Sequence, residues 1–161
     1  MKPVCACLLL LISGWSGCDR KEQLTPSEKM ADPREVCVAN IERKIQEIVH
    51  TTKDWELAES RIYLQTYFDG DDIPDAILLT GFDHGNFDRQ EIFVCLSSSP
   101  RNVMHLEIGH RGERIAQQMK IENRKIVVTG KLYGPKDATC CPSHLFTATF
   151  AVADGKLAEV K

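Results

Sequence analysis

The residues of this sequence most suited to covalent chemistry are its seven cysteines. Cys5 and Cys7 lie in the apolar start of the chain, and Cys18 ends that segment. The remaining four lie further along, at Cys37, Cys95, Cys140 and Cys141. An even number of cysteines in an exported domain predicts disulfide bonds, so we take these four as disulfide candidates.

The adjacency of Cys140 and Cys141 bears on how the four cysteines pair. A trans peptide holds neighbouring Cα atoms about 3.8 Å apart, whereas disulfides usually span roughly 4.4–6.8 Å. We therefore expect Cys37 and Cys95 each to bond to one of the two neighbours, in either of two arrangements. A Cys140–Cys141 bond together with a Cys37–Cys95 bond is the third connectivity.

A zinc site built from Cys140, Cys141 and His144 is the alternative for the same segment. Zinc sites usually contain paired ligands two to four residues apart, and the sequence has no Cys-x-x-Cys. An oxidising compartment also disfavours free thiolates. The sequence thus favours disulfides over a metal.

Carboxylates are concentrated between residues 69 and 75, where Asp69, Asp71 and Asp75 have spacings used by calcium loops. Such a loop needs a glutamate at its twelfth position, where Thr80 stands, and a glycine at its sharp turn, which is missing. Asp and Gly also favour turns for conformational reasons alone. We expect a plain β-turn and no cofactor, with calcium as the alternative.

Enzyme motifs are missing from the sequence. There is no Gly-x-Ser-x-Gly elbow, no phosphate-binding glycine loop and no His-Glu-x-x-His. His105 and Glu107 share one face of a predicted strand, which is more typical of a solvated surface than of an acid–base pair. The chain is accordingly not predicted to be an enzyme, and no catalytic residue is assigned.

The elements that would position these residues are one helix and a series of strands. Asp32 and Pro33 predict a helix start, and Cys37, Ile41, Ile45 and Ile48 then recur at helical spacing to about His50. Alternating segments follow at 61–68, 76–79, 90–97, 103–109, 113–121, 125–133, 144–153 and 156–160. Asp154-Gly155 predicts a hairpin turn. The expected class is α+β, mostly β: an antiparallel meander of about seven strands with one N-terminal helix packed on it.

The N-terminus has the pattern of a lipoprotein secretion signal. A lysine at position 2 precedes a short apolar run that is too brief to span a bilayer, and Ser16-Gly17 lead into Cys18. We interpret 1–17 as the signal peptide, Cys18 as the lipidated residue, 18–31 as a flexible tether and 32–161 as a single domain. An uncleaved signal anchor is the alternative. Asp19, directly after Cys18, resembles the residue that retains lipoproteins in the inner membrane of enteric bacteria, so it favours that membrane.

Charge excludes one class of partner. The formal net charge is −3 at pH 7, whereas binding nucleic acid phosphates needs a concentrated basic surface. We expect contact with the membrane through a lipid, an envelope protein or small ligand as partner, and no nucleic acid.

Two strings resemble those of a known group: Asp69-Gly70-Asp71 with Pro74-Asp75-Ala76, and Asp137-Ala138-Thr139-Cys140-Cys141-Pro142-Ser143. They are similar to the DGDxxDA turn and DAxCCPS motif of a set of largely uncharacterised bacterial exported proteins and lipoproteins. The mycobacterial LppP/LprE lipoproteins share the second motif. The resemblance covers about residues 60–161 and implies an envelope location and a small β-rich domain, but no activity.

Three functions are therefore considered. The first is a membrane-anchored cell-envelope lipoprotein, facing the periplasm or exterior, with a non-catalytic binding or structural domain. The second is a secreted inhibitor of lysozyme or of a protease. The third is a hydrolase with an unrecognised site. An exposed loop with a reactive side chain would favour an inhibitor, and a pocket with convergent polar groups would favour an enzyme.

Overall fold

The structure, a computed structural model, describes residues 32–160 except 53–54 and 86. This part of the chain forms one helix and eight strands, which confirms the predicted α+β, mostly β class. In chain order they are α1 (Pro33–Thr51), β1 (Glu56–Thr66), β2 (Asp75–His84), β3 (Phe87–Cys95), β4 (Val103–His110), β5 (Arg114–Glu122), β6 (Lys125–Leu132), β7 (His144–Ala153) and β8 (Lys156–Val160).

The predicted signal peptide (1–17), Cys18 and the tether (18–31) lie outside the described residues. Within the described residues, no helix is long enough and apolar enough to cross a bilayer.

Helix α1 begins as its sequence predicts. The Asp32 carboxylate accepts a hydrogen bond from the Arg34 backbone N–H at 3.0 Å and also pairs with the Arg34 guanidinium. These bonds lower the pKa of Asp32 to about 2. The predicted apolar stripe is buried: Cys37, Ile41, Ile45 and Ile48. These side chains pack on Ala76, Leu78, Phe82, Phe93 and Cys95 of the neighbouring sheet.

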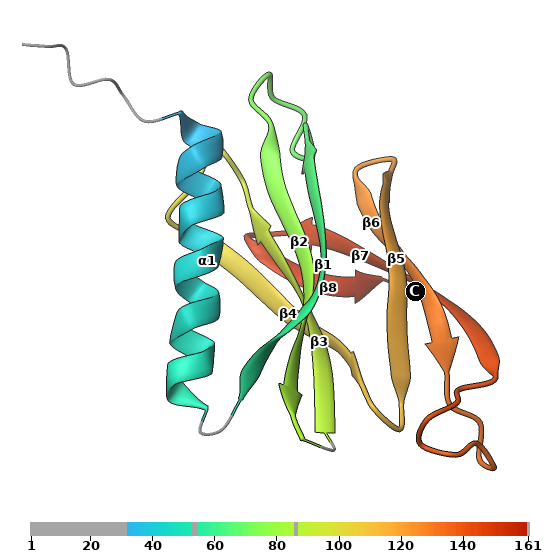
Figure 1. Ribbon diagram of the computed structural model, residues 1–161. Helices are drawn as coiled ribbons and strands as arrows, with labels where there is room; N and C mark the ends of the chain where they lie inside the picture. Colours follow the sequence, from blue (N-terminus) through green and yellow to red (C-terminus); the bar gives the residue numbers. More distant parts are fainter. Residues whose placement is uncertain (1–31, 53–54, 86, 161) are drawn as a thin grey trace, which may run out of the picture. The chain divides into compact units, whose positions relative to one another are not determined.

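The strands are antiparallel and follow chain order, but they form two four-stranded sheets instead of one continuous meander. The first sheet has the order β1-β2-β3-β4 and the second has the order β5-β6-β7-β8 (Figure 1). A single sheet of eight strands with one helix on it would leave most of its other face in water. Dividing it lets the two halves bury apolar faces against each other.

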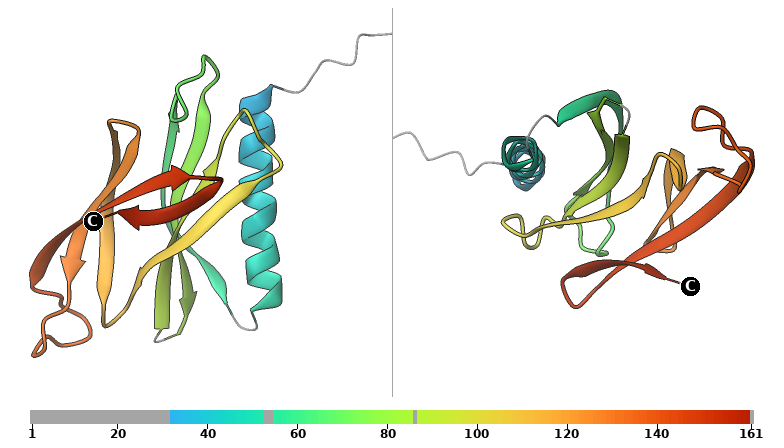
Figure 2. Two further views of the ribbon diagram at one scale, coloured as in Figure 1. Left: turned by 180° about the vertical axis from the view of Figure 1, so that it is seen from behind. Right: turned by 90° about the horizontal axis from the view of Figure 1, so that it is seen from below.

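The described part is therefore built in three layers. Helix α1 covers one face of the first sheet, and the second sheet lies against its other face (Figure 2, right). The core between the sheets contains Ile77, Ile92 and Val94 from the first sheet and Ile126, Val128 and Phe150 from the second. The central strand β2 thus buries both of its faces, since every residue of Asp75–Phe82 is buried.

Up-and-down connectivity places alternate connections at the same end of the layers. The β2–β3, β4–β5 and β6–β7 connections lie at one end, as both side views show (Figures 1 and 2). At the other end of the first sheet lie the β1–β2 and β3–β4 connections. The predicted Asp154-Gly155 hairpin is confirmed, since both residues have positive φ, 52° and 69°.

Candidate functional site at the 133–143 loop

Cys37 and Cys95 form a disulfide with each other, with their Cα atoms 5.4 Å apart. Both residues are 0 % exposed, because α1 packs directly over the end of β3. The bond therefore joins the helix to the first sheet. Neither cysteine is reached by solvent in the folded protein.

The expected links from Cys37 and Cys95 to the Cys140-Cys141 segment are wrong. Cys140 and Cys141 are bonded to each other, with Cα atoms 3.8 Å apart, which is the third connectivity. The physical reason is topological. Cys95 ends β3 at the β3–β4 end of the layers, whereas Cys140 and Cys141 lie in the β6–β7 connection at the opposite end. The adjacency of Cys140 and Cys141 in the sequence carries no information on this separation.

The connection between β6 and β7, residues 133–143, is held in shape mainly by Asp137. Its Oδ2 accepts hydrogen bonds from the Gly134 and Ser143 N–H groups, each at 2.8 Å, and its carboxylate accepts the Ser143 hydroxyl at 2.9 Å. The N–H bonds from Gly134 and Ser143, then the Ser143 hydroxyl, lower the pKa of Asp137 below its ordinary value of 3.8.

Two further hydrogen bonds support the same loop. The Tyr133 hydroxyl donates to the Thr139 carbonyl at 2.7 Å, and the Cys141 N–H donates to the Ala138 carbonyl at 2.9 Å. Residues 138–141 nevertheless remain exposed to solvent. The loop is thus a surface feature whose backbone is organised before any partner arrives.

The chemistry available to this loop is narrower than its residue types suggest. Both sulfurs are in the disulfide, so Cys140, Cys141 and His144 do not present a set of zinc ligands. The described residues also contain no group of three His, Cys, Asp or Glu side chains placed to hold a metal ion. The Ser143 hydroxyl donates a hydrogen bond to the Asp137 carboxylate, whose lowered pKa makes it a weak base. That arrangement binds the hydroxyl in place and does not activate it as a nucleophile.

A hollow of about 300 Å³ lies beside the loop and is lined by Asp88, Arg111, Ile115, Tyr133, Thr139 and Cys140. We call it the loop hollow. A smaller hollow of about 90 Å³ shares Asp88, Arg111 and Ile115 with it and extends to Arg89, Gln90 and Arg114. The residues come from β3, β5 and the β4–β5 and β6–β7 connections, so the common end of the layers assembles them.

Asp88 lines the loop hollow and uses one of its two carboxylate oxygens. Its Oδ2 contacts the Arg111 guanidinium at 3.2 Å. Its Oδ1 is buried and has no hydrogen-bond partner among the described residues. A buried carboxylate oxygen without a donor is unfavourable, and a group from outside reaches this atom only if the side chains that cover it move.

The acidic turn between β1 and β2 uses its carboxylates internally. Asp75 is 0 % exposed and accepts hydrogen bonds from the N–H groups of Asp69 and Ser97, at 3.0 and 2.8 Å. Asp69 accepts from the Asp71 N–H at 3.1 Å, and Asp71 accepts from the Ile73 N–H at 2.8 Å. Hydrogen bonding of this kind is what makes aspartate a turn residue, and it supports the interpretation as a plain turn. Calcium binding stays a prediction for experiment.

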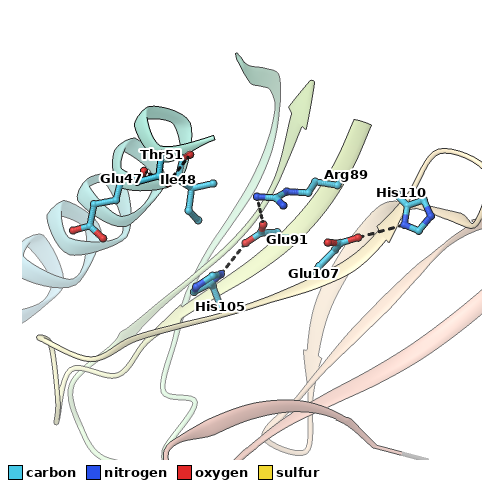
Figure 3. A network of polar contacts seen from close by, with 8 residues as sticks. All are labelled: Glu47, Ile48, Thr51, Arg89, Glu91, His105, Glu107 and His110. Carbon is cyan, nitrogen blue, oxygen red and sulfur yellow. Dashed lines mark hydrogen bonds and ion pairs between the residues drawn. The ribbon is translucent and has the colours of Figure 1, made fainter. Parts of the chain in front are cut away.

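A polar network around the buried Glu91 lies beside the C-terminal part of α1, between the helix and the first sheet (Figure 3). Glu91 is 3 % exposed and contacts Arg89 at 3.0 Å and His105 at 2.9 Å. The His105 ring also stacks on Phe93, with centroids 5.6 Å apart. Glu107, which the sequence placed on one face with His105, is exposed like His105 and contacts His110 at 3.3 Å. Glu91 is thus a buried carboxylate that pairs with one half-buried and one exposed partner, while Arg89 Nε has no hydrogen-bond partner among the described residues.

Sequence patterns indicated the loop but missed the residues around it. Asp88 and Arg111 stand outside any motif and lie 52 and 29 positions from Cys140. Glu91 sits among apolar residues of a strand, where a charge on one face suggests a solvent-exposed position. The burial of a charged residue such as Glu91 can be recognised only when the elements that pack on both faces of its strand are known.

Comparisons of the chain with protein-family models, with curated proteins and with solved structures found no match.

Proposed function

We propose that this chain is a lipid-anchored protein of the bacterial cell envelope whose folded domain is a non-catalytic binding module. In this proposal the domain recognises another envelope protein with the end that carries the 133–143 loop and the loop hollow. The first half of the proposal rests on the sequence, and the second half rests on geometry.

The anchor is supported by the short apolar run that ends in Ser16-Gly17-Cys18. Metabolic labelling with palmitate, followed by membrane fractionation, tests it in the wild type and in Cys18→Ala. We expect label and membrane association in the wild type and loss of both in the variant. An unlabelled, freely soluble wild type contradicts the anchor without bearing on the binding end.

The binding role is supported by one observation above all. A surface loop preorganised by Asp137 adjoins a polar hollow that is lined by the Asp88–Arg111 ion pair. A loop already fixed in shape loses little conformational entropy when a partner binds. The hollow itself is at the lower limit of the roughly 300–1,000 Å³ typical of small-molecule pockets, which favours a protein that contacts loop and hollow together.

Site-specific photo-crosslinking in cells that make the full chain tests this surface. A crosslinking residue at exposed Thr139 should give a discrete adduct, identified by mass spectrometry. The matched position is Lys156, which is also exposed and follows the β7–β8 turn. We expect no adduct from it, and a weakened Thr139 adduct when Asp137→Ala removes the loop's acceptor. No adduct at Thr139, or equal adducts at both positions, would contradict the proposed surface.

An inhibitor is the second candidate, because an exposed loop with a fixed backbone is also how a small domain blocks an enzyme. Lysozyme and a panel of proteases would be assayed with the wild type and with Asp137→Ala. Inhibition that is lost in the variant would support this candidate over a general binding module. Unchanged enzyme activity in both cases would leave the binding module as the better proposal.

A further inference from the structure

We infer that the Cys140–Cys141 pair is a reversible thiol–disulfide exchange site whose reaction partner is a protein dithiol. The inference requires neither the lipid anchor nor the proposed binding role. It follows from the different positions of the two disulfides in the fold.

Cys37 and Cys95 are separated by 58 positions, so their bond closes a long loop and restricts the unfolded chain. Cys140 and Cys141 are separated by one position. A bond between neighbours encloses no intervening residue, and the unfolded chain loses almost no freedom by making it. Stability of the fold therefore gives no reason for this second bond.

The two disulfides also differ in how accessible they are to solvent. Cys37 and Cys95 are fully buried under α1, whereas Cys140 and Cys141 are both exposed. Thiol–disulfide exchange needs a thiolate to reach a disulfide sulfur, so only the second pair is open to attack in the folded protein. The loop hollow beside Cys140 leaves space for the side chains that flank an attacking cysteine.

Opening of the Cys140–Cys141 bond does not require the loop to unfold. The hydrogen bonds that Asp137 accepts, together with the Tyr133–Thr139 bond, involve no sulfur atom. They hold the backbone on both sides of the pair in either redox state. The two thiols of the reduced form consequently stay next to each other, and the ring can close again.

The reaction balances with a dithiol as the partner. A partner thiolate attacks one sulfur of the pair, the Cys140–Cys141 bond breaks, and the other sulfur leaves as a thiolate while a mixed disulfide forms. The partner's second thiolate then attacks the mixed disulfide and releases the second cysteine. The partner is oxidised to a disulfide by two electrons, and Cys140 and Cys141 take up two protons as thiols. The same steps run in reverse when the partner is a disulfide.

Graded reduction of the folded protein tests the accessibility of the pair. The wild type is equilibrated with dithiothreitol at increasing concentrations, alkylated and analysed by peptide mapping, with circular dichroism recorded in parallel. We expect Cys140 and Cys141 to be alkylated at reductant concentrations at least about tenfold below those that open Cys37–Cys95, with the fold unchanged. Simultaneous reduction of both bonds, or a 140–141 bond that opens only on unfolding, overturns the inference.

Ring closure is tested with glutathione disulfide as the probe. Fully folded protein with a reduced 140–141 pair should return to the closed disulfide and carry no glutathione, because the second thiolate displaces it. Cys140→Ser and Cys141→Ser each keep one thiol and should retain one glutathione. A wild type that accumulates glutathione to the same extent as the two variants contradicts an exchange site, since its ring then fails to close.

Discussion

Removal of the Cys37–Cys95 bond is the perturbation whose cost the structure lets us work out most directly. For a separation of 58 positions, the chain-entropy model gives about 4 kcal/mol of stabilisation at 25 °C, an upper figure because strain and residual structure reduce it. The double variant Cys37→Ala/Cys95→Ala should lose about that much. The matched control is Cys140→Ala/Cys141→Ala, which alters an exposed pair and should change the free energy of unfolding by less than about 0.5 kcal/mol.

Urea unfolding followed by tryptophan fluorescence measures both variants, because Trp55 lies beside the first sheet at the end of α1. With a slope of about 2 kcal/mol per molar, a loss of about 4 kcal/mol moves the midpoint down by about 2 M. The control should keep the wild-type midpoint. Equal shifts in the two double variants, or a larger shift in the control, would refute the division into one structural and one exposed disulfide.

Three further predictions concern the acidic turn, the buried network and the loop. Calcium should leave the melting temperature within about 1 °C of its value in chelator, because the turn's carboxylates are already hydrogen-bonded; a rise of several degrees that Asp71→Ala removes would reverse that view. Glu91→Ala should lower the free energy of unfolding by roughly 2 kcal/mol, since it removes a buried carboxylate and leaves the half-buried Arg89 without its partner. The control is Glu107→Ala, at the exposed position paired with Glu91 on the next strand, which should lower the free energy of unfolding by less than about 1 kcal/mol. Similar losses of free energy in the two variants, measured by denaturant titration, would contradict a stabilising role of the Glu91 network. Because hydrogen bonds hold the pKa of Asp137 below 3.8, its contribution to the loop is complete above that pH and is lost as the pH falls through the lower native value. In an NMR pH titration of the wild type, the Ser143 amide resonance should shift below pH 3.8. If the same shift occurred in Asp137→Asn, Asp137 would not be the group that titrates.

Local patterns were enough to predict most of the elements. Asp32, Pro33 and the Cys37–Ile48 spacing located α1 because capping and amphipathic burial depend on residues within a few positions. The same holds for Asp154-Gly155, where positive φ is a property of the turn itself. The strands after residue 100 were placed within one or two residues for the same reason.

Features that depend on distant residues were not predictable. The division into two sheets arises from burial of two sheet faces against each other, and alternation along a strand does not say which face of another sheet will cover it. The disulfide pairing failed for a similar cause, because adjacency of Cys140 and Cys141 carries no information on the end of the fold to which Cys95 points. Asp88 of β3 and Arg111 of the β4–β5 connection line the loop hollow only because the fold brings them beside the β6–β7 connection.

Non-reducing peptide mapping of the protein purified from an oxidising compartment tests the central claim most directly. Cleavage after lysine and arginine places Cys37, Cys95 and the neighbouring pair in three different peptides, residues 35–43, 90–101 and 137–156. We predict that the first two peptides are joined by one disulfide, and that peptide 137–156 is linked to neither and is two hydrogens lighter than its dithiol form. A disulfide between peptide 137–156 and either of the others, or free thiols at Cys140 and Cys141 in that sample, would contradict the assignment of a buried structural bond and a separate exposed one.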